Sequence, residues 1–154
     1  MLARLAKTEG RKTIALLGDM RELGALERER HEELWEKLRT FDIDHYIFVG
    51  AVSCEVIQPM VDEKWQNKTF FTLDSRVAGE YIRALLAGDP DKYLLFAKGS
   101  QNTIFLEEGI KKFLLSSDDE SLLCRQSQDW MRKKEHFFQP SIAVNNNKQQ
   151  TGNI

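Results

Sequence analysis

Cysteine and histidine are scarce in this sequence and do not form the patterns of a metal or redox site. The 154 residues include two cysteines, Cys54 and Cys124, and three histidines, with no Cys-x-x-Cys pair and no ligand spacing. We therefore expect neither zinc nor redox chemistry and assign no metal ligand. Both thiols are expected to be buried.

Long hydrophobic runs and an excess of one charge are also missing. The longest apolar stretches, such as residues 14–17, are far shorter than the ~20 residues that cross a bilayer, and the first residues lack a secretory pattern. The 22 basic and 24 acidic side chains are interspersed along the chain. We expect no membrane or nucleic-acid partner, and a cytoplasmic location.

Several motifs of self-sufficient catalysis are absent as well. The chain has no Gly-x-x-x-x-Gly-Lys-Ser/Thr, no Gly-x-Gly-x-x-Gly and no Gly-x-Ser-x-Gly. A complete nucleotide site or a covalent nucleophile is therefore not expected, and no catalytic residue is assigned. Whatever this chain binds, it contributes only part of a site.

The composition is that of a folded domain followed by a short tail. With 42% hydrophobic and 30% charged residues, the chain is not disordered throughout, and its length fits one domain. We place this domain at residues 1–135 and a flexible tail at residues 136–154. Beyond Phe138 the tail is rich in Asn, Gln, Ser, Gly and Thr, with one charged residue, Lys148.

The apolar pattern of residues 12–115 switches between short continuous runs and helical spacing. Four runs predict buried strands, at residues 13–17, 46–49, 69–73 and 93–97. Helical spacing occurs at residues 1–8, 34–41, 52–61, 78–85 and 104–115. The pattern predicts an α/β, Rossmann-like three-layer domain with a mainly parallel sheet. Residues 121–134 predict one more strand, at 121–124, and a short basic helix.

Polar residues and glycines follow the predicted strands, and the ends of parallel strands meet at one edge of a sheet. Gly18 and Asp19 follow the first strand, and Lys98, Gly99 and Ser100 follow the fourth. Asp19 fits either a contact to ribose hydroxyls or a cap of the following turn. The Lys98–Gly99–Ser100 turn fits a carboxylate or phosphate, or a strand-to-helix turn without a ligand.

Two further polar residues have a structural and a functional interpretation. His31 shares a helical stripe with Leu34, Trp35 and Leu38, which favours a buried core histidine. Its functional alternative is a neutral imidazole that binds a ligand or positions the Asp19 loop. Asp74, after the third strand, is interpreted as a helix cap more readily than as a contact residue.

Several of these residues together resemble one family. Residues 17–24 read Leu-Gly-Asp-Met-Arg-Glu-Leu-Gly, and His31, Val49-Gly50, Lys98-Gly99-Ser100 and Glu107 follow in order. This pattern resembles the carboxyl-terminal domain of the Mur ligases of peptidoglycan synthesis, in particular the members that add D-alanyl-D-alanine to a UDP-muramoyl tripeptide. The resemblance covers roughly residues 1–115.

The resemblance implies a third domain that closes over a central ATPase domain. In that family ATP phosphorylates a carboxylate of the UDP-muramoyl peptide, and the incoming amine attacks the acyl phosphate. Asp19, with Gly18, would contact the ATP ribose. Lys98, Gly99 and Ser100 would help to hold D-alanyl-D-alanine, and His31 is grouped with them without a defined chemical role. The Mg²⁺ ligands belong to the central domain, so the isolated chain is expected to be inactive.

The sequence departs from the family at one position and leaves alternatives open. Gln101 stands where the family usually has arginine, while the absent Asp-Asn-Pro-Arg word favours the dipeptide-adding type. One alternative is the same domain from a ligase with another acceptor, such as folate or an amino-acid polymer. Another is a non-catalytic regulatory or receiver-like module with Asp74 as phosphoacceptor.

Overall fold

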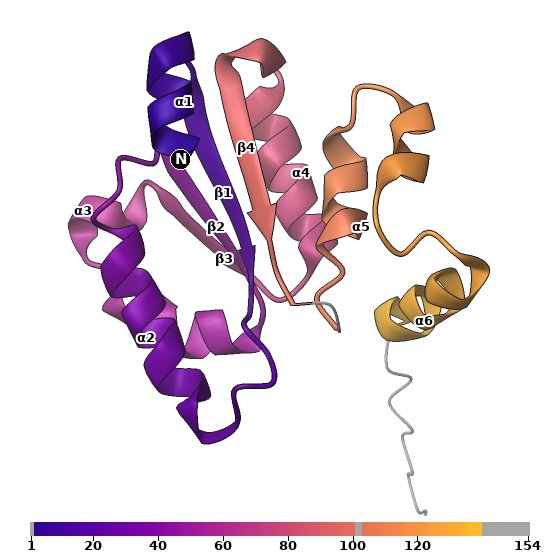
Figure 1. Ribbon diagram of the computed structural model, residues 1–154, viewed down its shortest axis with the longest axis horizontal. Coiled ribbons are helices and arrows are strands. Elements are labelled where there is room, and N and C mark those ends of the chain that lie inside the picture. Colours follow the sequence, from indigo (N-terminus) through magenta and orange to yellow (C-terminus); the bar gives the residue numbers. More distant parts are fainter. Residues whose placement is uncertain (1, 101–102, 140–154) are drawn as a thin grey trace, which may run out of the picture.

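A four-stranded parallel sheet forms the centre of the computed structural model, which describes residues 2–100 and 103–139 (Figure 1). The strand order is β3-β2-β1-β4, and every pair is parallel. The predicted α/β class is confirmed, and each strand end lies within one residue of its prediction. The strands are β1 (Lys12–Gly18), β2 (His45–Val49), β3 (Thr69–Thr72) and β4 (Tyr93–Lys98).

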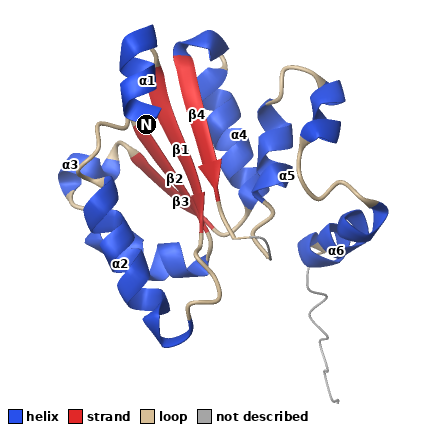
Figure 2. Ribbon diagram, in the orientation of Figure 1, coloured by secondary structure: helices blue, strands red, loops and turns tan. Residues whose placement is uncertain are grey.

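Helices cover both faces of the sheet, so the domain has three layers (Figure 2). The α-helices are α1 (Leu2–Glu9), α2 (Glu27–Leu38), α3 (Glu63–Gln66), α4 (Ser75–Leu86), α5 (Leu106–Ile110) and α6 (Gln128–Phe138). The helix predicted at residues 52–61 contains a π-helical turn, Ser53–Ile57, and a 3₁₀ turn, Gln58–Met60. The helix predicted at residues 104–115 is shorter, because α5 ends in a 3₁₀ turn, Lys111–Phe113.

The strand residues alternate between two hydrophobic cores. Ile14 and Leu16 face α4 and α5, where they pack in one cluster with Ile82. Ala15 and Leu17 face the opposite layer and belong to the cluster of Trp35 in α2. This alternation follows from the two-residue period of a strand, and burial on both faces explains why β1 is apolar at consecutive positions.

Two glycines bring α4 and α5 into backbone contact. A Cβ atom on Gly79 would overlap the carbonyl oxygen of Gly109, and a Cβ on Gly109 would overlap that of Ser75. Only glycine permits this approach, because any side chain would separate the helices. The position of α5, which follows the loop after β4, is therefore set by α4.

The segment after α5 differs from its prediction. The strand predicted at residues 121–124 is wrong, because a 3₁₀ helix occupies Ser117–Leu122 and the Ser116 hydroxyl accepts the Asp118 N–H at 3.2 Å. The short basic helix is present as α6 and extends to Phe138, so it includes residues 136–138 of the predicted tail. Residues 140–154 of that tail lie outside the described residues. We call residues 114–139 the C-terminal segment.

No helix within the described part of the chain is long and apolar enough to cross a membrane.

Candidate functional site

The loops that follow β1 and β4 lie side by side at the carboxyl edge of the sheet; we call residues 18–21 and 98–100 the rim. Leu17 pairs with Lys98 in the parallel ladder. A Cβ on Gly18 would lie 3.3 Å from the Cα of Gly99, so the two loops meet through their backbones. The N–H of Arg21 donates to the Ser100 hydroxyl oxygen at 2.9 Å. The expected juxtaposition of these two strand ends is present.

Asp19 is buried, and its carboxylate binds the turn after β2. With 1% of its surface exposed, Asp19 accepts hydrogen bonds from the N–H of Val52 at 2.9 Å and of Ser53 at 2.8 Å. The Ser53 hydroxyl donates a third, at 2.6 Å. Asp19 is therefore a cap, although it caps the segment after β2 and not the turn after its own strand.

Gly50 makes room for this carboxylate. Its φ of +136° is rarely adopted by other residues, and a Cβ there would overlap the carboxylate of Asp19. The strand ends Gly18-Asp19 and Val49-Gly50 are thus fitted to each other. A contact of Asp19 with a ribose would require this carboxylate to become accessible, because only 1% of the residue's surface is exposed.

His31, in α2, holds the loop that carries Asp19 and Met20. The buried imidazole accepts the Met20 N–H at Nε2 (3.1 Å), and Nδ1 donates to the Glu27 carbonyl at 2.7 Å. Because Nε2 accepts, the ring is neutral, and its 3.8 Å approach to Asp19 Oδ1 is not an ion pair. His31 is thus the expected core histidine, and it also orients the Asp19 loop.

Lys98, Gly99 and Ser100 line a pocket of about 220 Å³, which we call the rim pocket. Lys98 is exposed at the end of β4. The other lining residues come from β4, α5 and the C-terminal segment: Ala97, Leu106, Glu107, Ile110, Leu123, Cys124 and Arg125. Cys124 is exposed and Cys54 is partly buried, so the prediction that both thiols are buried is wrong.

Glu107 forms a buried ion cluster that the sequence analysis did not identify. Nε and Nη2 of Arg125 donate to its two carboxylate oxygens at 2.8 and 2.6 Å, and Nζ of Lys134 lies 3.0 Å from Oε1. Burial by itself raises the pKa of Glu107, but the hydrogen bonds from Arg125 and Lys134 outweigh burial and hold this pKa below its ordinary value of 4.5. The basic character of residues 125–134 was the available signal.

Asp74 caps α4, as predicted. Its carboxylate accepts the Arg76 N–H at 2.8 Å and binds the Arg76 guanidinium, with Nη2 at 2.6 Å from Oδ2. The hydrogen bond from the Arg76 side chain lowers the pKa of Asp74, although partial burial acts in the opposite direction. Both oxygens of Asp74 are therefore engaged with one arginine.

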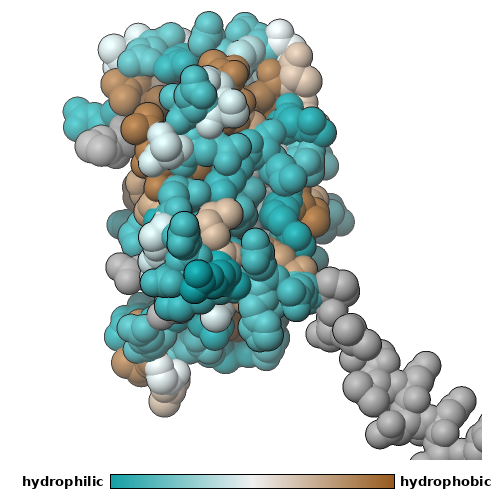
Figure 3. All heavy atoms as spheres, turned by 90° about the vertical axis from the view of Figure 1, so that its right-hand side faces the viewer, coloured by the Kyte–Doolittle hydropathy of each residue, from teal (hydrophilic) through white to brown (hydrophobic). Residues whose placement is uncertain are grey.

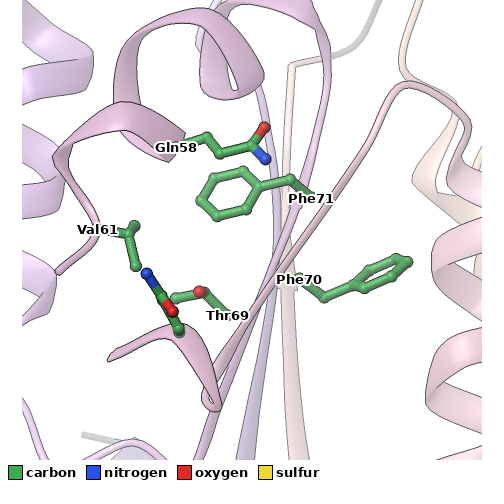
Figure 4. A pocket seen from close by; sticks show the side chains of 6 residues that line it. Gln58, Val61, Thr69, Phe70 and Phe71 are labelled. Atoms are coloured by element: carbon green, nitrogen blue, oxygen red, sulfur yellow. The ribbon is translucent and has the colours of Figure 1, made fainter. Parts of the chain in front are cut away.

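A second pocket, of about 420 Å³, lies along β3, away from the rim (Figure 4). Phe71 and Thr69 point toward it, whereas Phe70 points to the other face and stacks on Tyr81 of α4. None of the six residues that line this pocket is charged. It offers no acid, base or anion-binding group.

The rim does not fit a self-sufficient ATP site. The carboxylate of Asp19 is enclosed, and residues 2–100 and 103–139 hold no cluster of three or more His, Cys, Asp or Glu residues able to bind a metal ion. The exposed ammonium of Lys98 and the Ser100 hydroxyl fit an anion. The chemistry available here is binding and orientation.

Comparisons with known proteins reveal a similar fold among solved structures. Neither a protein-family model nor a curated protein matches the sequence. Two crystal structures of MurF from Acinetobacter baumannii are similar, with TM-scores of 0.56 and 0.52 and sequence identities of 16% and 17%. The similarity covers 72% and 65% of this chain, but only 24% and 21% of the MurF chains. The chain thus spans about a quarter of those proteins, and at this identity the likeness establishes a Mur ligase-like α/β fold.

Proposed function

We propose that this chain is the third, carboxyl-terminal domain of a cytoplasmic, ATP-dependent ligase that forms amide bonds in peptidoglycan precursors. Its partner is a central ATPase domain, which would bind Mg²⁺ and most of the ATP. The substrates are a UDP-muramoyl peptide and D-alanyl-D-alanine. The isolated chain is not expected to turn over.

The observation that carries this proposal is the meeting of the β1 and β4 loops at one edge. An exposed ammonium and a hydroxyl lie together on a fold that is similar to part of MurF. Of the residues that resemble the family, 18–21 and 98–100 form this edge, and His31 and Gly50 contact the loop after β1. A site made of binding groups without a reactive group is what an orienting domain needs.

The rim residues have separate tasks in this proposal. Lys98, Gly99 and Ser100 bind the incoming dipeptide, and closure of the domain excludes water from the acyl phosphate. Asp19 acts through the loop that it holds, because its carboxylate is buried and hydrogen-bonded to the turn after β2. ATP lies between the rim and the central domain, with its ribose beside the Gly18–Asp19 loop.

Reconstitution tests the proposal. A MurF that lacks its third domain is fused to this chain, and phosphate release is measured with UDP-muramoyl tripeptide and D-alanyl-D-alanine. We expect ATP-dependent ligation, and Lys98→Ala should lower kcat/KM for the dipeptide at least about tenfold. Lys92→Ala is the control, because Lys92 is exposed at the opposite end of β4.

Failure to restore ligation with any amine would count against the domain assignment. Ligation with a different amino acid, but not with the dipeptide, would support the domain assignment and show that the incoming amine is not D-alanyl-D-alanine. Equal decreases in kcat/KM for Lys98→Ala and Lys92→Ala would show that the rim does not bind the dipeptide.

A further inference from the structure

The C-terminal segment forms one side of the rim pocket. Leu123, Cys124 and Arg125 line it together with the Lys98–Ser100 loop and with residues of α5. At about 220 Å³ the pocket is smaller than the roughly 300–1,000 Å³ of sites for drug-sized ligands. It suits a small ligand or the end of a peptide.

Arg125 is held so that part of its guanidinium stays available. Nε and Nη2 bind Glu107, which uses one edge of the planar group. Among the described residues Nη1 has no hydrogen-bond acceptor, and the side chain is 16% exposed beside the pocket. The other edge, formed by Nη1 and Nη2, can therefore donate two parallel hydrogen bonds to a second carboxylate.

The backbone at Arg125 is in an unusual conformation. Its φ of +59° lies in the left-handed region, as does that of Phe105 (+46°) on the loop between β4 and α5. Such conformations cost free energy in residues other than glycine and persist where the surroundings fix them. At Arg125 the buried Lys134 is one such constraint, because its Nζ donates to the Arg125 carbonyl at 2.8 Å.

The charges that line the pocket favour an anion. Lys98 and Arg125 are the positive residues in the lining, and Glu107 is the one acidic residue. Glu107 pairs with Arg125 and with Lys134, which also binds Glu108. The Ser100 oxygen accepts a hydrogen bond from Arg21, and among residues 2–100 and 103–139 its own proton has no acceptor. The face of the molecule on the side of α5 and α6 is mostly hydrophilic (Figure 3), which favours a small polar ligand over an apolar partner.

We infer that the rim pocket binds the terminal carboxylate of a short peptide or amino acid, between Lys98 and Ser100 on one side and Arg125 on the other. The inference rests on the proposed function and adds to it a binding residue, Arg125, from the C-terminal segment. Glu107 and Lys134 are positioning residues for that guanidinium. The amine of the same ligand then points out of the pocket, toward the central domain.

The thiol of Cys124 gives a direct test, because it is exposed and lines the pocket. In the full chain with Cys54→Ser, Cys124 is the only cysteine, and its alkylation rate is followed by mass spectrometry. We expect D-alanyl-D-alanine to slow alkylation at least about fivefold at saturation. Its carboxamide analogue, which lacks the negative charge, should give no protection.

Two variants assign the donors. Arg125→Lys keeps a charge beside Glu107 but removes the second donor edge, and it should raise the dipeptide concentration for half-protection about tenfold or more. Lys98→Gln should raise the dipeptide concentration for half-protection in the same way, whereas Lys92→Gln should leave this concentration unchanged. As a control, the hydrogen exchange rates of the α6 amides are measured in Arg125→Lys. Rates equal to those of the wild type are expected and mean that the C-terminal segment remains docked.

The outcomes separate this inference from the proposed function. Equal protection by dipeptide and carboxamide, no protection by either, or tighter protection by inorganic phosphate would each overturn the carboxylate site. If the reconstituted ligase works and Arg125→Lys leaves its KM for the dipeptide unchanged, the domain assignment stands and this inference fails. Carboxylate-dependent protection without ligation would support the site and count against the ligase.

Discussion

At the scale of single residues, the polar groups of the rim divide into those that hold the loops and those that remain available. Asp19 and His31 are fully used inside the chain, and both act on the loop after β1. Lys98 and Arg125 line the pocket, and among the described residues Nη1 of Arg125 has no acceptor. The presence of a residue in a motif therefore does not indicate whether its side chain contacts the ligand or stabilises the loops of the chain.

Gly50→Ala should destabilise the domain, because the new Cβ would overlap the Asp19 carboxylate at a φ of +136°. We expect the free energy of unfolding in urea to fall by about 2–4 kcal/mol. The matched control is Gly88→Ala, where nothing lies within 4 Å of the added Cβ, and its effect should stay within about 1 kcal/mol. Similar losses in both variants would refute the packing described for Asp19.

The stability contributed by Glu107 should depend on pH. The pKa of Glu107 in the folded chain lies below 4.5, its ordinary value, because hydrogen bonds from Arg125 and Lys134 outweigh burial. Its contribution is therefore complete above about pH 5 and is lost as the pH falls from 4.5 through the folded pKa. The difference in unfolding free energy between the wild type and Glu107→Gln should be constant above pH 5 and shrink below 4.5. Urea titrations at several pH values measure it, and parallel pH curves would contradict it.

At the scale of elements, α6 is fastened to the domain by ion pairs and by aromatic packing. Lys134, which is 3% exposed, binds Glu107 and Glu108 of α5. Phe105 packs edge-to-face on Phe137 at 5.2 Å between ring centres, and the Arg76 guanidinium lies 4.0 Å from the ring centre of Phe138. The helix thus connects the loop after β4 to the start of α4.

Lys134→Ala should loosen α6, because the buried carboxylate of Glu107 and the partly buried one of Glu108 would lose a partner. We expect the α6 amides to exchange hydrogen faster, consistent with a loss of about 2–4 kcal/mol of docking free energy. Lys133→Ala is the neighbouring control: Lys133 is exposed and lies 4.4 Å from the Trp130 ring centre, a contact worth about 0.5–1 kcal/mol. Unchanged exchange in Lys134→Ala would show that the aromatic contacts alone hold the helix.

At the scale of the whole molecule, the alternative of a receiver-like module makes a distinct prediction. A receiver would accept a phosphoryl group on Asp74, but both oxygens of Asp74 bind Arg76. Treatment with acetyl phosphate should therefore leave the intact mass of the chain unchanged. Addition of one phosphoryl group at Asp74 would favour the receiver, and Asp74→Asn would confirm the position.

The sequence predicted the sheet well because its strands are short, apolar and buried on both faces. The strand predicted at residues 121–124 was wrong, because two leucines and a cysteine in a row offer no alternation that distinguishes a strand from a turn. In the structure Leu122 is 80% exposed, so it is not a core residue. The capping role of Asp19 depends on the turn after β2, 33 residues away in the chain. Likewise, the Glu107–Arg125 pair forms only when the C-terminal segment folds back on α5. Such contacts are set by tertiary packing and leave no periodic signal.

The glycine contact between α4 and α5 determines which side of the pocket tolerates change. Leu106 and Ile110 lie on a helix in close backbone contact with α4, and a Cβ on Gly99 would lie 2.9 Å from Leu106 Cδ1. Leu123 and Cys124 belong to an irregular stretch with no such restriction. A mutant library designed to change which ligand is preferred should therefore vary these two positions. A larger or smaller side chain there changes the volume of the pocket and leaves the contact between α4 and α5 intact.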